Sequence, residues 1–343
     1  MPLVLVTGAS GFVGSHVVDE LLRNGYSVRG TVRSQNVARV SKSYASFGDR
    51  FATAVIDDLI TSDLSDAVKG VDAVIHVASP LSSGGTAQLV LDSAISGTNR
   101  VLEAVLAAGV KQLVVTASIA SLATQEDLWK QVTLDHKSYS PLTLEDALKP
   151  DASPFVVYMV SKAITDLAVR DFKRAHPELD LTTIHPSYIY GPLGTGQVYH
   201  QAATGTNRHI YALIAGPPGR PVGGYARTAR GPPQSVDVRD VARAHVLALK
   251  APPSVETKRF ILRPSEFVWT DAIELLARAR PELKERLPVV TGDEPPVGPF
   301  CTLDDSAARD VLGLNTYIKW EDTVLDTVDD LLRVEKELAS AAK

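Results

Sequence analysis

Cysteine is nearly absent from this chain of 343 residues, in which Cys301 is the only one. A disulfide within the chain is therefore excluded, and this favours a reducing compartment. A lone cysteine could be a nucleophile, but it is more often a small apolar side chain in a core. We therefore expect Cys301 to fill space rather than to react.

Long apolar runs are also missing, since none approaches the ~20 residues that span a bilayer. The N-terminus lacks the basic start and the small-residue cleavage site of a signal peptide, and residues 3–6 read as the start of a strand. We therefore expect a cytoplasmic protein without a membrane partner.

No excess of positive charge is present, because the net charge is −5 and the sequence pI is about 5.9. This balance gives no electrostatic reason to expect a nucleic-acid partner. Arg220, Arg227 and Arg230 cluster loosely among glycines and prolines. A solvated loop is the favoured interpretation of this cluster, and contact with an acidic ligand is the alternative.

Short apolar runs alternate with longer helical patterns through the first 190 residues. The runs are rich in Val, Ile and Leu, as expected of strands buried on both faces. Predicted strands are 3–7, 27–32, 52–56, 73–77, 113–116 and 181–185, and predicted helices are 14–23, 64–69, 88–107 and 155–175. Such alternation predicts an α/β fold with a doubly wound parallel sheet, which binds ligands at the carboxyl ends of its strands.

The composition changes after Tyr190, where residues 191–233 are rich in glycine and proline. A strand at 236–238 and a helix at 240–250 resume the earlier rhythm, followed by a strand at 260–262 and helices at 270–278 and from 321 onward. We predict a nucleotide-binding domain over 1–186, to which 235–262 returns. Residues 187–234 and 263–343 would form a smaller, C-terminal substrate-binding lobe.

A glycine-rich loop at residues 7–14 joins the first predicted strand to the first helix. Gly8, Gly11 and Gly14 are spaced three apart in it. Glycines here permit a tight turn, let backbone N–H groups approach a pyrophosphate, and let the helix pack closely on the strand. The helix N-terminus also favours an anion. The position of the loop therefore predicts a dinucleotide site.

The end of the second strand predicts which dinucleotide is bound. Residues 30–34 contain no acid that would hydrogen-bond a ribose and repel a 2′-phosphate. Arg33 could pair with that phosphate through its planar fork. Ser34 could add a hydroxyl, and Arg39 or Lys42 further charge. The alternative is an exposed loop arginine, but the pattern favours NADP(H) over NAD(H).

Tyr158 and Lys162 lie four residues apart on a predicted helix and therefore share one face. A hydride that reaches a carbonyl carbon leaves negative charge on the oxygen, which then needs a proton. A neighbouring ammonium group lowers the pKa of a phenol, so Lys162 could tune Tyr158 as the proton donor. Ser118, just past the fifth strand, could hydrogen-bond the same oxygen.

Each of these residues also has an ordinary structural interpretation. Tyr158 could be an amphipathic helix residue, Lys162 a solvated one, and Ser118 a turn residue. The catalytic interpretation depends on their coincidence with the glycine loop and the strand order, and we favour it on that ground.

These motifs together resemble the extended short-chain dehydrogenase/reductase family. The chain has the loop T-G-x-x-G-x-x-G, the Tyr-x-x-x-Lys pair with its serine, and two segments typical of the extended branch, at 185–192 and 236–242. Residues 32–34 and 76–80 look most like dihydroflavonol reductases, cinnamoyl-CoA reductases and fungal aldehyde or methylglyoxal reductases. The resemblance covers residues 3–250.

The resemblance implies a Rossmann-type fold, a set of cofactor residues and no metal. Asp58 would contact the adenine edge, Lys162 the nicotinamide ribose, and the segment around Pro186 would pass the nicotinamide. The implied cofactor set is Thr7, Gly8, Ser10, Gly11, Phe12, Val13, Gly14, Arg33, Asp58, Leu59, Val77, Ala78, Ser79, Lys162 and Pro186.

Three positions depart from the family pattern. Val37 stands where this branch often has a second basic residue, and Ala117 where the family often has a serine. No catalytic asparagine can be assigned, because Asn99 lies on a predicted helix and could be structural. His76 would more often be a satisfied core histidine than a ligand.

The implied activity is NADPH-dependent reduction of an aldehyde or ketone, reversible as oxidation of the alcohol, by a monomer or homodimer. Leu81, Leu122, Tyr188, Val198 and Tyr199 favour an apolar or aromatic substrate, although they would also serve a core. Two alternatives stay open: a sugar-nucleotide epimerase or dehydratase on the same scaffold, and a non-catalytic dinucleotide sensor.

Overall fold

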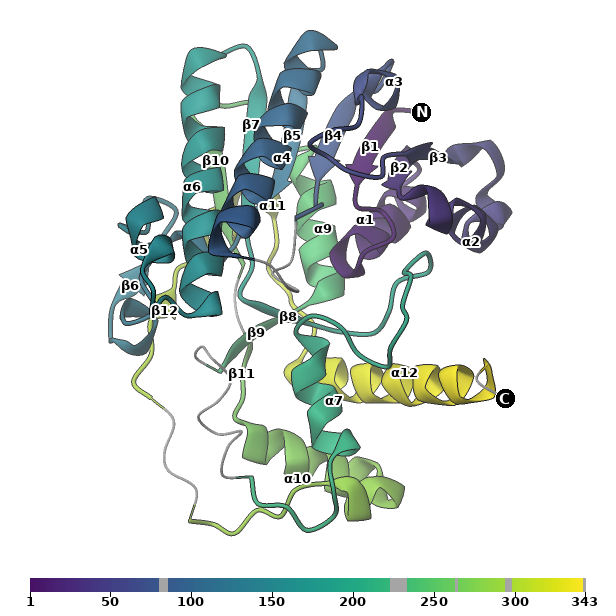
Figure 1. Cartoon of the computed structure of the whole chain (residues 1–343), viewed down its shortest axis with the longest axis vertical. Coiled ribbons are helices and arrows are strands. Elements are labelled where there is room, and N and C mark those ends of the chain that lie inside the picture. The colour runs from purple at the N-terminus through teal and green to yellow at the C-terminus, as the bar shows by residue number, and fades with distance from the viewer. Residues whose placement is uncertain (80–85, 223–232, 263–264, 294–297, 342–343) are drawn as a thin grey trace.

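The main sheet has seven parallel strands in the order β3-β2-β1-β4-β5-β7-β10 (Figure 1). The computed structural model of the chain describes residues 1–79, 86–222, 233–262, 265–293 and 298–341. The strands are β1 (Leu3–Thr7), β2 (Ser27–Val32), β3 (Phe51–Val55), β4 (Ala73–His76), β5 (Gln112–Thr116), β7 (Asp180–His185) and β10 (Lys258–Ile261). The order reverses between β1 and β4, which is where such sheets bind ligands. The predicted Rossmann-type α/β fold is confirmed.

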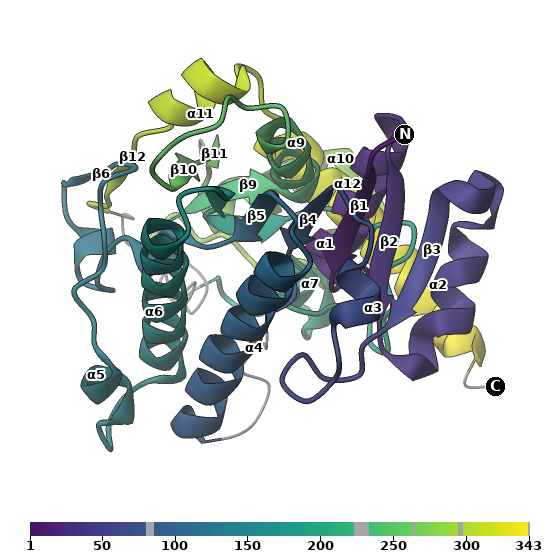
Figure 2. The ribbon, with the colours of Figure 1, turned by 90° about the horizontal axis from the view of Figure 1, so that it is seen from above.

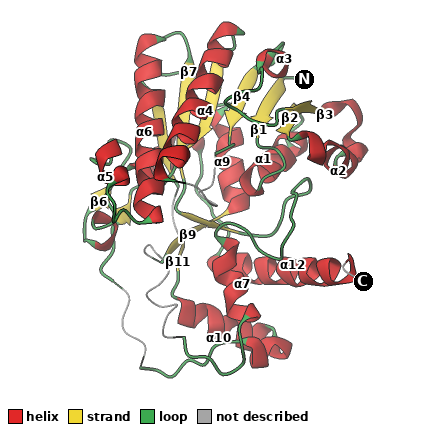
Figure 3. Ribbon diagram, in the orientation of Figure 1, coloured by secondary structure: helices red, strands yellow, loops and turns green. Residues whose placement is uncertain are grey.

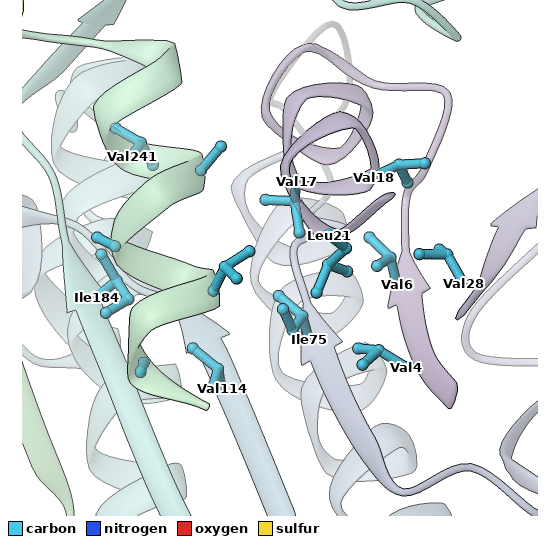
Figure 4. Close-up of a cluster of buried hydrophobic side chains, with 14 of the residues drawn as sticks. Val4, Val6, Val17, Val18, Leu21, Val28, Ile75, Val114, Ile184 and Val241 are labelled. Atoms are coloured by element: carbon cyan, nitrogen blue, oxygen red, sulfur yellow. The ribbon is translucent and has the colours of Figure 1, made fainter. Parts of the chain in front are cut away.

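Helices cover both faces of this sheet, with α4 and α6 on one side and α9 and α11 on the other (Figure 2). Alternate strand residues point to opposite faces. Val4 and Val6 thus join the cluster around α1 and α9, which Figure 4 shows, whereas Leu5 joins the cluster under α4. The helices are α1 (Phe12–Arg23), α2 (Val37–Ser43), α3 (Ser65–Val68), α4 (Ala87–Ala107), α5 (Leu144–Leu148), α6 (Pro154–Ala175), α9 (Val238–Ala248) and α11 (Ser306–Leu312).

The two long helices next to the catalytic motifs begin at side-chain caps. Thr86 caps α4 by accepting a hydrogen bond from the backbone N–H of Leu89. Ser153 caps α6 by accepting one from the N–H of Val156, and Pro154 occupies the first turn, where its missing N–H is no loss. These caps fix the start of α6, and therefore the turn of the helix that carries Tyr158.

A second group of elements lies beyond the sheet, around α7 (Asn207–Ala215), α10 (Trp269–Ala279) and α12 (Trp320–Ala341) (Figure 3). Their core includes Phe267, Trp269 and Val328. A three-stranded sheet of β8 (Tyr188–Tyr190), β9 (Gln234–Asp237) and β11 (Ser265–Glu266) adjoins them, and β6 (Thr133–Leu134) pairs with β12 (Thr302–Leu303). Because α11 contacts α9 and β10, part of the predicted lobe lies against the main sheet. The domain division stays a prediction.

Most predicted elements agree with the structure to within two residues at each end. The predicted strand 236–238 is β9, which joins the small sheet and not the large one. The sequence missed α2, α5, α7, α11 and the shortest strands, because a few residues show too little periodicity. Among the described residues, no helix is both long and apolar enough to cross a membrane.

Candidate active site

The glycine loop after β1 is so tight that two of its glycines leave no room for a Cβ atom. A Cβ on Gly14 would lie 2.0 Å from the carbonyl oxygen of Gly8. Gly8 itself has φ +72°, and a Cβ there would lie 3.1 Å from Ala78 of the loop after β4. Both glycines are therefore required by the backbone.

The loop presents the N-terminus of α1 without a competing side chain. Gly11 is the N-cap and offers no side-chain acceptor, and the first turn contains no acid. The loop is held from both sides, since the N–H of Gly8 donates to Thr31 Oγ1 at 3.0 Å and the N–H of Val198 donates to the Ser10 carbonyl at 3.0 Å. Uncapped N–H groups in a cradle that a Cβ would fill are suited to a pyrophosphate.

Thr7 ties the loops after β1 and β4 together. Its Oγ1 accepts from the N–H groups of Val77 and Ala78, each at 3.1 Å, and lies 2.8 Å from Nδ1 of His76. Because both acceptor positions of the hydroxyl are filled, its proton points to His76, whose Nδ1 must accept. Burial and then the charge of Lys162 lower the pKa of His76 to about 4, so it is neutral. His76 is a satisfied core histidine.

The part of the site that is predicted to hold the adenosine lies after β2, where Arg33 and Ser34 are exposed. The N–H of Ser34 donates to Asp57 Oδ1 at 2.7 Å. This bond and, to a lesser degree, the charge of Arg33 lower the pKa of Asp57. The sequence argument missed Asp57, an acid that comes to this place from the end of the neighbouring strand β3.

Asp58 and Leu59 take two different places. Asp58 Oδ1 accepts from the N–H groups of Ile60 and Thr61 at 2.6 and 3.1 Å, which is the geometry of a local turn. Leu59 lines the cavity beside Lys162. The contact of Asp58 with an adenine edge stays a prediction.

Ser118, Tyr158 and Lys162 meet at the carboxyl edge of the sheet. Ser118 follows β5 and caps a short 3-10 turn (Ile119–Ser121), whereas the other two lie on α6. Tyr158 is hydrogen-bonded to Ser118. Lys162 Nζ lies 5.9 Å from the centre of the Tyr158 ring and donates to Ser79 Oγ at 3.1 Å. The structure thus brings the predicted trio together beside the loop after β4.

Burial shifts both titratable members of the trio. It raises the pKa of Tyr158, and the hydrogen bond with Ser118 opposes this rise. It lowers the pKa of Lys162 to about 8, because the low-dielectric surroundings disfavour the ammonium form. Lys162 can therefore change its charge close to neutral pH.

A narrow cavity of about 20 Å³ lies beside Lys162, lined by residues of β4, β5, α4 and α6. Its lining is partly polar and includes Thr98, Thr165 and Asp166. Asn99, the next residue on α4, is exposed on the outer face of the helix. The structure therefore gives Asn99 no place in the site.

Sequence reasoning missed the charged pair beneath Ser118. Asp166 of α6 and Arg259 of β10 form an ion pair of 2.6 Å, with side chains 1% and 4% exposed. The spacing of Asp166, four residues after Lys162, was the available signal. Arg259 comes from 93 residues further along the chain, so local patterns could not indicate it.

The residues predicted to line a substrate pocket are dispersed. Leu122 is buried in the core beside α6, and Val198 adjoins the glycine loop. Tyr199 contacts Glu337 of α12 and lies under Arg39, whose guanidinium carbon is 4.5 Å from the ring centre. Leu81 falls in 80–85, outside the described residues.

Arg220 is half-buried, and its guanidinium donates to four backbone carbonyls, those of Ala212, Leu213, Pro217 and Arg286. The first two are carbonyls of the last turn of α7, which the helix leaves unpaired. Arg227 and Arg230 lie outside the described residues.

Cys301 is buried, which raises its pKa to about 11, as expected of a space-filling thiol. Within the described part of the chain, no group of three or more His, Cys, Asp or Glu side chains is placed to hold a metal.

Comparisons with known proteins identify a family and relatives for this chain. Residues 4–262 match the model of the NAD dependent epimerase/dehydratase family. The ketoreductase azaE of Aspergillus niger is 34% identical over 343 residues, covering 96% of this chain and 97% of the relative. The NADPH-dependent methylglyoxal reductase GRE2 of Saccharomyces cerevisiae is 28% identical, with 97% and 98% covered.

A solved structure agrees with these relatives. The crystal structure of Gre2 in complex with NADPH from Candida albicans has a TM-score of 0.83 and 26% identity, and the match covers 97% of this chain and 99% of that one. The predicted resemblance is therefore confirmed over nearly the whole chain, and the chain belongs to the NAD dependent epimerase/dehydratase family, as an oxidoreductase of the extended short-chain dehydrogenase/reductase type.

Proposed function

We propose that this protein reduces the carbonyl group of an aldehyde or ketone with NADPH, reversibly oxidising the alcohol, and that Tyr158 donates the proton. The observation that carries the proposal is that Ser118, Tyr158 and Lys162 meet at the carboxyl edge of the main sheet. Three residues from β5 and α6 converge there beside the loop that the cofactor would pass.

The cofactor in this proposal is NADP(H), as the names of the GRE2 relative and the Candida albicans complex indicate for those proteins. The backbone of residues 8–14 would hold the pyrophosphate, and Arg33 with Ser34 the 2′-phosphate. Lys162 would hold the nicotinamide ribose, between Val77–Ser79 and Pro186. Bound NADPH supplies the hydride.

The side chains account for the fate of the carbonyl oxygen. As the carbonyl carbon gains a hydride, negative charge develops on the oxygen. The hydroxyl of Ser118 stabilises this charge by hydrogen bonding, and the phenol of Tyr158 transfers its proton to the oxygen. A cationic Lys162 favours the tyrosinate that remains. In the oxidation direction the same tyrosinate takes the proton from the alcohol.

The substrate would be apolar or aromatic and would bind between the main sheet and the lobe of residues 187–234 and 263–343. That lobe contains an aromatic cluster in which Tyr190, Phe267 and Trp269 pack edge to face. The relatives named ketoreductase, aldehyde reductase and methylglyoxal reductase act on carbonyl compounds by name. These names support the same class for this chain.

The test is oxidation of NADPH, and separately of NADH, with a panel of aldehydes, ketones and 1,2-dicarbonyls. We expect carbonyl-dependent oxidation of NADPH that Tyr158→Phe abolishes while NADPH binding persists. Purified protein that carries tightly bound NAD and turns over no carbonyl would favour the epimerase alternative. NADPH binding without turnover of any carbonyl, and no effect of Tyr158→Phe, would favour the sensor.

A further inference from the structure

The catalytic face of α6 continues one turn beyond Lys162 to Asp166. Tyr158, Lys162 and Asp166 are four residues apart in turn and therefore lie along one side of the helix. Asp166 Oδ2 accepts from Ser121 Oγ at 3.0 Å and from Arg259 Nη2 at 2.6 Å. Ser121 is the last residue of the short turn that begins beside Ser118, so a carboxylate on the catalytic helix holds the catalytic turn.

His185, the last residue of β7, holds the same turn from the sheet side. Its Nδ1 lies 3.3 Å from the carbonyl oxygen of Ser118 and 3.3 Å from Ser121 Oγ. Its Nε2 lies 2.8 Å from the Thr183 hydroxyl and 3.8 Å from Asp166 Oδ1. Burial lowers the pKa of His185 to about 4, so the neutral ring persists at neutral pH.

The hydrogen bonds of the turn converge on Ser121 and on the backbone of Ser118. Ser121 Oγ has one proton and lies 3.0 Å from Asp166 Oδ2 and 2.8 Å from the Ser118 carbonyl oxygen. The Ser121 hydroxyl thus links the carboxylate to the backbone of Ser118, which His185 also contacts. The backbone of Ser118 is therefore held in place, and its side chain, whose Oγ accepts from the N–H of Ala120 at 3.2 Å, is a hydrogen-bond partner of Tyr158.

The ion pair under this turn needs a reason, because burying two charges rarely stabilises a fold on balance. Arg259 is anchored away from the turn, since it donates to the carbonyls of His136 and Ser138 and its guanidinium carbon lies 3.8 Å from the Tyr139 ring centre. It therefore presents a fixed cation to Asp166, and Asp166 presents a fixed acceptor to Ser121.

We propose that Asp166 is a positioning residue that acts through Ser121, together with His185, to hold Ser118 in its hydrogen bond with Tyr158. The inference rests on the proposed function, in which Ser118 and Tyr158 act on the substrate carbonyl. Asp166 contacts neither the substrate nor the cofactor in this account.

Two substitutions loosen the turn from the helix side. Ser121→Ala removes one hydroxyl, and Asp166→Asn keeps the shape but removes the charge. Each is expected to lower kcat for carbonyl reduction by about tenfold while the KM for NADPH changes less than about twofold. The alkaline limb of the kcat profile that Tyr158 sets, which lies above the decline that Lys162 causes, should also move to higher pH, because the hydrogen bond from Ser118 lowers the pKa of Tyr158. A general loss of folded enzyme would leave that limb in place.

The deciding experiment is a double-mutant cycle with Ser118→Ala, measured as kcat on folded protein. If Asp166 and Ser121 act through Ser118, each substitution should lower kcat less than about twofold in the Ser118→Ala background. Ser235→Ala, which removes a buried hydroxyl of β9, is the matched control and should leave kcat unchanged. If Asp166→Asn fails to fold, Ser121→Ala carries the cycle alone.

The outcomes distinguish a failure of the positioning role from a failure of the proposed function. Losses that multiply fully with that of Ser118→Ala would overturn the positioning role and leave the proposed function standing. Full turnover by Ser118→Ala would overturn the role of Ser118 and the positioning role with it, whereas no carbonyl turnover by the unsubstituted protein would overturn the proposed function itself.

Discussion

The glycine loop follows β1 and the catalytic turn follows β5, two strands that β4 separates, and both lie at the carboxyl edge of the main sheet. At the loop, backbone groups and the absence of Cβ atoms create the site, as the 2.0 Å gap at Gly14 shows. At the turn, side chains with shifted pKa values do so, and buried charges support them. Under the proposed function, cofactor binding would depend on the space that the glycines leave, whereas the reaction would depend on the charge of side chains.

The largest effect is expected from Lys162→Met, which removes the charge at nearly constant volume. Reduction should fall on the order of 10³-fold, because Tyr158 and the ribose both lose their cationic partner. The fold should become more stable at pH 7. The pKa of Lys162 lies below its usual 10.5, so the buried ammonium destabilises the protein, and this penalty fades as pH rises through about 8.

Turnover and the Tm of Lys162→Met at pH 7 and pH 9 check this prediction. A Tm that falls at pH 7, or retained turnover, would contradict the division between a charged catalytic end and a backbone-built binding end.

The next largest effect is expected at the glycine loop. Gly14→Ala places a Cβ against the Gly8 carbonyl, so the loop must open. NADPH affinity should fall about 100-fold, since a displacement of about 1 Å costs that much in an oriented site. Titration of NADPH binding by fluorescence measures it. Gly25→Ala, which strains an exposed glycine with φ +84° after α1 and lies away from the loop, controls for a general loss of stability. Wild-type affinity in Gly14→Ala would contradict the role assigned to the cradle.

The sequence predicted the loop and the Tyr-x-x-x-Lys pair because each is a local spacing on a single strand–helix junction or helix face. It could not predict what supports them. Arg259 reaches Asp166 across 93 residues, and Val198, from the segment after β8, donates to the carbonyl of Ser10. Such pairs depend on the topology, which brings β10 beside β7, and not on any period in the sequence.

A smaller effect is expected where the adenosine would bind, because both backbone groups and a charged side chain, Arg33, lie there. Arg33→Ala should reduce the preference for NADPH over NADH by about tenfold, the worth of one charge-assisted hydrogen bond. The ratio of the two kcat/KM values measures it. Arg23→Ala, which removes an exposed arginine paired with Glu20 at the other end of α1, is the control. An unchanged ratio in Arg33→Ala would assign the 2′-phosphate to another cation.

An effect of similar size concerns pH. Because Lys162 has a pKa of about 8 in the free protein, kcat/KM for NADPH should be level below that pH and decline as pH rises through it. Between pH 7 and pH 9 we expect a loss of about tenfold, in line with one lost proton. Lys162→Arg keeps its charge, so whatever activity it retains should stay level over this range. A level profile in the unsubstituted protein would contradict the shifted lysine.

One measurement tests the central claim, that Tyr158 supplies the proton at a site whose cofactor is held by other groups. Tyr158→Phe is loaded with NADPH and mixed with an aldehyde substrate, and a single turnover of NADPH oxidation is followed. The account predicts NADPH affinity within about twofold of the unsubstituted protein and a rate lower on the order of 10³-fold. An unchanged single-turnover rate would contradict it.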